Sequence, residues 1–192
     1  MDEKQLILAL KKGGRAAYEK LFLHYKDMVL NTCLGFVPNQ HDAEDICQEV
    51  FVKIFRTIEQ FKGESKLSTW IYRIAVTESL QHIRNKKRKK RVAFFQSLIG
   101  MEGQTENIKA DDYNHPGVSL ENKERSQILF EHISRLPENQ KVAFTLHKIE
   151  GMAYKEIAEI MEMSLSSIES LMFRAKKNLK KGLHDFYNKQ MI

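Results

Sequence analysis

The stretch AYKEIAEIMEMSLSSIESLMFRAKKNL, Ala153 to Leu179, decides the fold of this chain. Its first part is a short amphipathic segment with apolar side chains at Ile157 and Ile160. Its second part is longer and more basic, and Ser164 or Ser166 can cap its first turn. A short helix, a tight turn and a longer helix is the spacing of a helix-turn-helix.

The longer of these two segments has two different faces. An apolar stripe contains Leu165, Ile168, Met172, Ala175 and Leu179. The opposite face has small polar residues first and cations afterwards: Ser166, Ser170, Phe173, Arg174, Lys177, Lys180 and Lys181. That order is typical of a recognition helix whose first turns enter the major groove while later lysines contact phosphates. The alternative is a solvated helix whose C-terminal lysines complement the helix dipole.

The rest of the chain predicts an all-α fold. The 192 residues include only 9 Gly and 3 Pro, and no hairpin dipeptide separates two apolar runs. A short helix should end at Gly13-Gly14, and apolar side chains recur every three or four residues over Arg15–Phe36. A third helix, over about Asp42–Ile58, has an apolar side that we expect to include these residues: Ile46, Val50, Ile54 and Phe55.

A basic run, IRNKKRKKR at Ile83–Arg91, ends a long helix that begins near Ser68. Seven of its nine residues are Lys or Arg, so subtracting them from the net charge of +6 leaves the rest of the chain near −1. The run can be a solvated tail, a nuclear address or the end of a helix that lies against nucleic acid. We favour the last, because the run continues a helix and its cations can neutralise phosphates.

The same long helix has two apolar sides. Leu67, Trp70, Ile71 and Ile74 form one of them, whereas Val76, Leu80 and Ile83 lie on the other. We therefore expect the helix to change packing partners midway and to project its last turns beyond the core.

Residues 92–117 lack a sustained period and predict a flexible linker. Between Glu102 and Glu124 there are six acidic residues and two lysines. This acidic segment either increases solubility or folds back on the basic run. The sequence thus divides into a helical block over residues 1–91, this linker, and a second helical block over residues 118–192.

Several classes of protein are disfavoured. Cys33 and Cys47 have neither disulfide-framework nor zinc-site spacing, and we expect buried, reduced thiols. The sequence offers no catalytic constellation, no metal site and no phosphate-binding glycine loop, so we expect neither an enzyme nor a cofactor. No apolar run is long enough to span a membrane and the N-terminus has no signal-peptide pattern, which favours a cytoplasmic protein without membrane insertion.

Three segments in this order resemble the extracytoplasmic-function (ECF) group of bacterial sigma factors, in the sigma-70 family. DAEDICQEVFVKIF, at Asp42–Phe55, resembles the acidic helix of their region 2. STWIYRIAVTESLQHIRNKKRKKR, at Ser68–Arg91, resembles the promoter-contacting helix that ends that domain, and Leu136–Leu179 resembles the region 4 helix-turn-helix. The resemblance implies a dissociable RNA polymerase subunit with two small helical domains, a region 2 bundle and a region 4 helix-turn-helix, joined by a flexible linker.

The resemblance also implies sites and partners. The expected partner is core RNA polymerase, with its largest and second-largest subunits. Docking on the clamp helices of the largest subunit would fall to Asp42, Glu44, Asp45, Gln48 and Glu49. The −10 element of promoter DNA would contact Phe61, Lys62, Lys66, Ser68, Thr69, Arg73, Arg84, Lys86, Lys87 and Arg88. The −35 element would contact Ser166, Ser167, Ser170, Phe173, Arg174 and Lys177. An anti-sigma factor would regulate the protein.

Four positions depart from the family pattern. Thr77 and Gln81 stand where Asn and Asp are common, and Glu169 and Leu171 stand where Lys and Arg are common. Because these four departures lie in the segments expected to contact DNA, no promoter sequence can be inferred from the family pattern. Two other classes remain: a stand-alone helix-turn-helix transcriptional regulator, which leaves the acidic helix unexplained, and a nucleic-acid-processing enzyme, which lacks clustered catalytic residues.

Overall fold

The computed structural model describes residues 2–37, 39–98 and 123–190. Within these ranges the protein consists of eight α-helices and one 3-10 turn without any β-strand, which confirms the all-α prediction. None of these described helices has an apolar stretch long enough to cross a lipid bilayer. Most of the expected linker lies outside the described residues.

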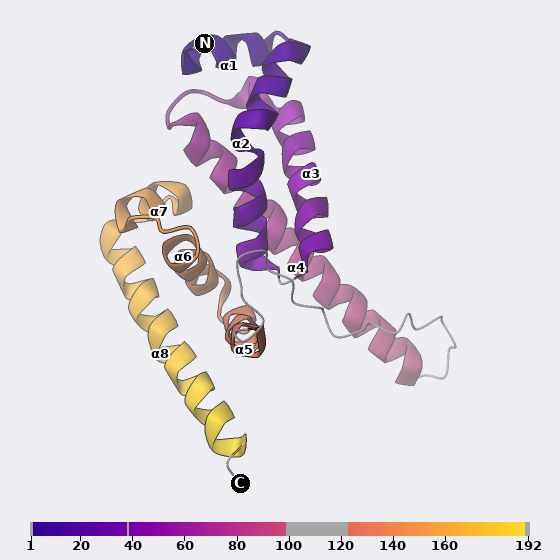
Figure 1. Cartoon of the computed structure of the whole chain (residues 1–192), viewed down its shortest axis with the longest axis vertical. Coiled ribbons are helices and arrows are strands. Elements are labelled where there is room, and N and C mark those ends of the chain that lie inside the picture. Colours follow the sequence, from indigo (N-terminus) through magenta and orange to yellow (C-terminus); the bar gives the residue numbers. More distant parts are fainter. Residues whose placement is uncertain (1, 38, 99–122, 191–192) are drawn as a thin grey trace.

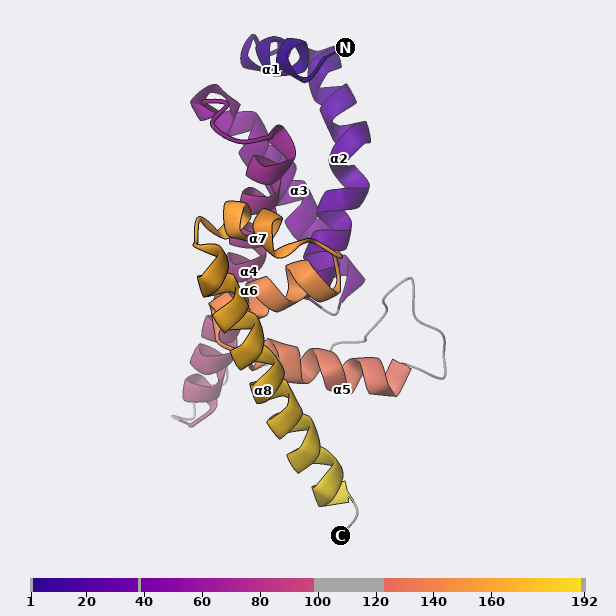
Figure 2. The same ribbon diagram turned by 90° about the vertical axis from the view of Figure 1, so that its left-hand side faces the viewer.

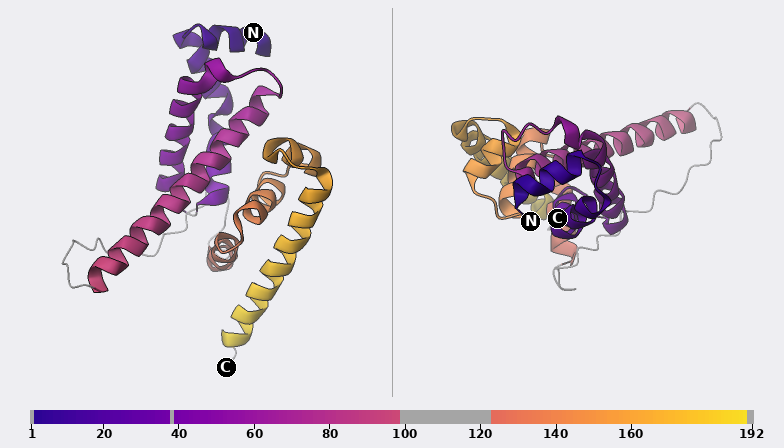
Figure 3. Two further views of the ribbon diagram at one scale, coloured as in Figure 1. Left: turned by 180° about the vertical axis from the view of Figure 1, so that it is seen from behind. Right: turned by 90° about the horizontal axis from the view of Figure 1, so that it is seen from above.

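The first unit contains the elements up to residue 98. They are α1 (Glu3–Lys11), α2 (Arg15–Phe36), α3 (Gln40–Thr57), η1 (Ile58–Gln60) and α4 (Leu67–Leu98). Helices α2, α3 and α4 pack side by side, and α1 crosses one end of the bundle (Figures 1 and 3). The side chain of Asn39 begins α3 by accepting a hydrogen bond from the amide of Asp42 at 3.1 Å. Helix α4 continues past Arg91 to Leu98, further than the basic run indicated.

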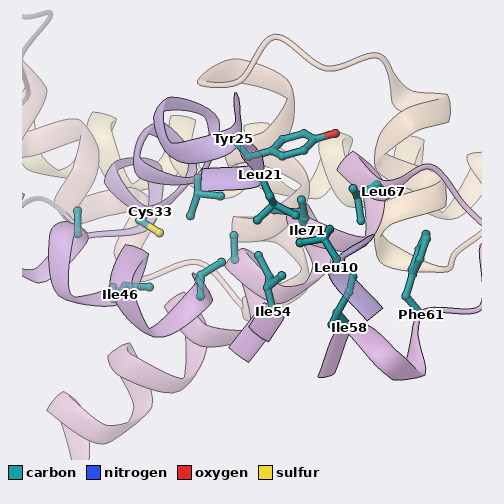
Figure 4. Close-up of a cluster of buried hydrophobic side chains, with 14 of the residues drawn as sticks. Leu10, Leu21, Tyr25, Cys33, Ile46, Ile54, Ile58, Phe61, Leu67 and Ile71 are labelled. Atoms are coloured by element: carbon teal, nitrogen blue, oxygen red, sulfur yellow. The ribbon is translucent and has the colours of Figure 1, made fainter. Parts of the chain in front are cut away.

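The core of the first unit lies between these helices (Figure 4). Leu10, Leu21, Ile46, Ile54 and Ile71 are each at most 2% exposed. Burying such a side chain stabilises the fold by about 1.5–3 kcal/mol. Their helical spacing fixes the rotation of α3 and α4, and hence which residues of these helices face solvent.

Both cysteines belong to this unit as free thiols. Cys33 is fully buried and Cys47 is half-buried. Burial raises the pKa of the Cys33 thiol to about 12 and that of Cys47 to about 11. Both thiols are therefore protonated at neutral pH. Cys33 is buried as expected, whereas Cys47 is only half-buried.

The second unit contains α5 (Lys123–Ser134), α6 (Glu138–Lys148), α7 (Tyr154–Met161) and α8 (Leu165–Gln190). Helices α7 and α8 form the expected helix-turn-helix around a core that includes Leu146, Ile157 and Ile168. The cap of α8 is Ser164, whose hydroxyl accepts from the amide of Ser167 at 3.2 Å, rather than Ser166. Leu165, expected in the apolar stripe, is 39% exposed.

The two units pack against each other, with α7 beside α4 and the end of α2 against α6 (Figure 2). Phe36 and Val76 of the first unit share an apolar cluster with Leu146 and Met152 of the second. Leu80 packs against the same cluster. Since Ile71 belongs to the core of the first unit, α4 does change packing partners midway, as expected.

Candidate partner-binding and nucleic-acid-binding surfaces

Four of the residues expected to bind polymerase share the outer face of α3. Glu44, Asp45, Gln48 and Glu49 are exposed, and positions four residues apart lie one turn above each other. This set is called the α3 acidic face below. Three carboxylates held on one rigid helix surface suit a basic partner and steer its encounter.

Asp42, the fifth residue, is oriented differently. Its Oδ2 accepts a hydrogen bond from Lys86 Nζ at 2.7 Å, and its Oδ1 lies 3.6 Å from His82 Nε2. The Asp42 side chain is 20% exposed. Asp42 therefore connects the start of α3 to the basic end of α4, and its carboxylate is already occupied within the protein.

A groove of about 440 Å³ lies between the acidic face and α4. Polar side chains line it together with one apolar residue: Asp45, Ile46, Gln48, Glu49, Glu78, Gln81, His82 and Asn85. A partner that contacts the α3 acidic face can also reach this groove.

Exposed aromatic side chains extend the same surface. Phe55 is 59% exposed and Phe22 is 46% exposed, so placing Phe55 on the core side of its helix was wrong. The Phe55 ring lies 4.7 Å from the ring of Tyr18, and Phe22 makes an edge contact with Phe51 at 4.9 Å. We call these four residues the α2–α3 aromatic patch. Sequence reasoning missed it, although Phe51 and Phe55 follow Gln48 at three- and four-residue spacing along α3.

The residues expected at the −10 element divide by exposure. Lys62 and Lys66 are exposed and Ser68 is half-exposed, whereas Thr69 is buried. Phe61 is 4% exposed and packs against Trp70, with ring centroids 5.2 Å apart. Phe61 belongs to the core of the first unit and the partly buried Trp70 packs against that core, which agrees with the expectation for Trp70.

Three of the cations expected on promoter phosphates are paired within the protein. Arg73 Nη1 lies 2.8 Å from Glu162 Oε1 in the second unit. Arg84 Nε donates to Glu138 Oε1 at 2.8 Å, and this hydrogen bond lowers the pKa of the Glu138 carboxyl. Lys86 pairs with Asp42, as above. The remaining two, Lys87 and Arg88, are exposed.

Helix α8 presents its expected reading face to solvent. Ser166, Ser170, Arg174 and Lys177 are exposed, and Phe173 is 70% exposed. Ser167 is half-buried, with its hydroxyl 2.8 Å from that of Ser164. Directly behind this face the stripe of Ile168, Met172, Ala175 and Leu179 is buried. Leu171, which departs from the family pattern, is also buried and does not belong to the reading face.

Lys141 is a buried cation at the side of the second unit near α4. It is 2% exposed, and its Nζ donates to the carbonyl of Ser134 at 2.9 Å. Burial, and then the nearby charge of Lys87, lower the pKa of Lys141 to about 8. Sequence reasoning did not single out this residue, because nothing in its local pattern distinguishes it from a surface lysine.

Comparison with known proteins covers both units. Residues 21–89 match the family model for Sigma-70 region 2, and residues 126–179 match that for Sigma-70 region 4. The ECF RNA polymerase sigma-E factor of Haemophilus influenzae is 30% identical over 179 residues, which span 92% of this chain and 93% of that protein. The RNA polymerase sigma-H factor of Pseudomonas aeruginosa is 28% identical over 189 residues, which span 95% of this chain and 94% of that protein.

Two solved structures share the fold. CnrH in complex with the cytosolic domain of CnrY gives a TM-score of 0.61 at 17% identity, covering 95% of this chain and 97% of that chain. The sigma factor RpoE in complex with the anti-sigma factor NepR, from Bartonella quintana, gives a TM-score of 0.57 at 20% identity. The match covers 87% of this chain and 96% of that chain.

Proposed function

The chain belongs to the ECF group of sigma-70 RNA polymerase sigma factors, and on this premise we propose which surface carries each step of promoter-specific initiation. The protein is a sigma factor, which directs core polymerase to promoters through their −10 and −35 elements. The first unit docks on polymerase and holds the −10 element. The second unit reads the −35 element.

The α3 acidic face and the α2–α3 aromatic patch together dock the protein on core polymerase. Charge on the acidic face guides a basic surface of the polymerase towards it, and the exposed rings supply apolar contact area. Phe22 and Phe55 are the expected energetic centre, because large aromatic side chains dominate most protein interfaces. Asp42 contributes indirectly, by holding α3 against α4.

The −10 element is held by the loop before α4 and by the basic end of α4. Lys62, Lys66 and Ser68 are the accessible polar side chains of the expected loop set, and they contact the backbone of the opened strand. Lys87 and Arg88 on α4 neutralise further phosphates. Phe61 and Thr69 act from inside the core, where they support the loop.

The −35 element is read by α8. The first turns place Ser166 and Ser170 at base edges, and Phe173 supplies an apolar contact of the kind that recognises thymine methyl groups. Arg174 and Lys177, one turn further, contact phosphates and set the register. The observation that carries this assignment is the exposure of the whole polar face of α8 over a buried apolar stripe.

The protein itself catalyses no reaction in this account, and polymerase performs the nucleotidyl transfer. Its place of action is the cytoplasm, where polymerase and promoters meet. An anti-sigma protein that covers the polymerase-binding and DNA-binding surfaces is the expected regulator, as the RpoE relative of the same fold is held by NepR.

Separate variants of the two units test this division. Asp45→Lys with Glu49→Lys should abolish comigration with core polymerase, whereas Arg174→Ala with Lys177→Ala should preserve comigration and remove protection of upstream promoter DNA. Asp27→Lys, a charge reversal at an exposed position of α2, is the matched control. Normal comigration of the α3 variant, or unchanged upstream protection with the α8 variant, would contradict the assignment.

A further inference from the structure

Helix α1 makes hydrogen bonds to both ends of the loop that precedes α4. Lys11 Nζ donates to the carbonyl of Phe61 at 2.7 Å, and Glu3 Oε1 accepts from the amide of Leu67 at 3.2 Å. Residues 61–66 are called the pre-α4 loop below. Resting on the function proposed above, we propose that Glu3 and Lys11 are positioning residues, which hold this loop in the shape that recognises the −10 element.

The pre-α4 loop is buried at its ends and open in its middle. Phe61 is 4% exposed and Leu67, the first residue of α4, is fully buried, and both belong to the core of the first unit (Figure 4). Lys62 and Lys66, which are proposed to contact the opened strand, lie between these ends and are exposed. The way in which the ends are held therefore sets where the two lysines project.

The middle of the loop makes weak contacts of its own. Gly63 has φ of 76°, which glycine adopts without strain, and a Cβ atom there would meet no atom within 4 Å. Ser65 Oγ donates to the carbonyl of the neighbouring Lys66 at a long 3.4 Å. Open space around Gly63 and one long hydrogen bond do not fix a loop, so its shape depends on the contacts at its two ends.

Helix α1 is a rigid support for these contacts. Leu10 is 1% exposed and lies in the same core cluster as both ends of the loop (Figure 4). The hydroxyl of Tyr18 on α2 donates to the Leu10 carbonyl at 3.3 Å. Glu3 and Lys11 are the first and last residues of α1, about 12 Å apart along the helix axis. One helix therefore sets the spacing between the two ends of the loop.

Both hydrogen bonds have an ionisable partner. Glu3 brings a carboxylate to the first amide of α4, where the dipole of this 32-residue helix favours negative charge. Lys11 brings an ammonium group to a backbone carbonyl. Burial, and then the nearby charge of Glu3, raise the pKa of Tyr25, which shows that the carboxylate lies close to the core. Hydrogen bonds with one charged partner are stronger than neutral ones.

A loop that captures an unstacked strand benefits from being ordered before the strand arrives. Ordering a flexible loop during binding costs conformational entropy, and preorganisation avoids this cost. Loss of the two contacts with α1 should therefore weaken recognition of the −10 element. It should leave docking through α3 and reading of the −35 element through α8 unchanged.

Paired substitutions separate the two hydrogen bonds from the rest of α1. Glu3→Ala and Lys11→Met each remove one hydrogen bond, whereas Glu3→Gln keeps an acceptor and Lys11→Arg keeps a donor. The conservative variants should behave like wild type. Asp2→Ala and Lys12→Met are the matched controls, because both residues are exposed neighbours and Asp2 makes no capping hydrogen bond through its side chain.

The first readout is hydrogen exchange of the Leu67 amide in the free full-length protein, measured by NMR. Exchange should be about fivefold faster in Glu3→Ala than in wild type, and unchanged in Glu3→Gln and Asp2→Ala. Exchange at the wild-type rate in Glu3→Ala would overturn the inference. Thermal unfolding identifies any misfolded variant, and the comparison of Lys11→Met with Lys12→Met by exchange of the loop amides then carries the test.

The second readout is promoter opening by holoenzyme, on a fragment that gives a run-off transcript with the wild-type protein. Permanganate reactivity of unpaired thymines should fall about tenfold in the double variant Glu3→Ala with Lys11→Met, and discrimination between −10 sequences should fall with it. Comigration with core polymerase and protection of the −35 element should stay at the wild-type level. Wild-type opening and discrimination, or equal losses at both promoter elements, would overturn the positioning role.

Failure of the proposed function would look different. Wild type and every variant would then open no promoter, which would overturn the role of α1 in recognition together with that function. Exchange of the Leu67 amide would still report whether Glu3 holds the loop.

Discussion

Lys86 of α4 holds Asp42 at the start of α3, with Nζ 2.7 Å from Oδ2. One of these residues belongs to the helix proposed to dock on polymerase, and the other to the helix proposed to contact the −10 element. The ion pair fixes the two helices relative to each other. The ion pair lies one turn or less from Lys87 and Arg88, which are exposed at the basic end of α4.

This ion pair should contribute measurably to stability because both side chains are partly shielded, with 32% exposure for Lys86 and 20% for Asp42. We expect Asp42→Asn to lower the free energy of unfolding by about 1 kcal/mol. A double-mutant cycle with Lys86→Met, measured by urea unfolding, should give a positive coupling energy. Strictly additive effects of the two substitutions would show that the pair does not join the helices.

Phe55 should be required for polymerase binding and dispensable for folding. Because its ring is 59% exposed, Phe55→Ser should change the free energy of unfolding by no more than about 0.5 kcal/mol. It should weaken the affinity for core polymerase by about tenfold or more, since it removes an exposed aromatic contact. Leu8→Ser, at a 61% exposed position on α1, is the matched control. Equal affinities for both variants would remove the aromatic patch from the interface.

Lys177 and Phe173 should affect DNA binding in different ways. Lys177→Ala should weaken binding of holoenzyme to all promoter sequences alike and lower the slope of log affinity against log salt by about 1. Phe173→Ala should leave that slope unchanged and reduce discrimination between −35 sequences. Filter-binding titrations over a range of salt concentrations separate the two effects, and loss of discrimination in Lys177→Ala would contradict the assigned roles.

Lys141 makes stability depend on pH. Its pKa in the folded protein is lowered to about 8, from 10.5 when unfolded, so the charged form is disfavoured in the fold. The destabilisation is fully present below pH 8 and is relieved as pH rises from about 8 towards 10.5, where the unfolded chain binds more protons. Between pH 7 and 9 the free energy of unfolding should rise by about 1 kcal/mol from this residue.

The pKa values of Cys33 and Cys47 are raised in the folded protein. The two thiols therefore lower the free energy of unfolding as pH rises above 9, the ordinary pKa of a thiol, which is opposite to the effect of Lys141. The informative quantity is therefore the difference between wild type and Lys141→Met, in which the thiol contributions cancel. A constant difference between pH 7 and 9 would show that Lys141 is not buried as described.

Periodicity predicted the helices well because each has a strong apolar side and clear ends. The expected bounds of α2, Arg15 and Phe36, are those observed. Periodicity was less reliable for single positions at the edge of a stripe: Phe55 and Leu165 fall outside the core. Side-chain type does not specify how far an edge residue is covered, because the neighbouring helix decides that.

The contacts between distant segments could not be predicted. The second apolar side of α4 indicated a second packing partner, but no local pattern identifies that partner as the helix-turn-helix unit. The pairing of Arg73 with Glu162 and of Asp42 with Lys86 joins residues far apart in sequence. For the same reason, Arg73, Arg84 and Lys86 were expected to be available to DNA, although each is paired in the free protein.

The most direct test of the account is run-off transcription with purified bacterial core polymerase, with and without this protein, from promoter fragments of the native genome. We expect transcripts with defined start sites that require the protein, are reduced by Lys87→Ala with Arg88→Ala, and are unchanged by Asp27→Asn. Absence of any protein-dependent transcript, together with failure of the protein to comigrate with core polymerase, would contradict the account.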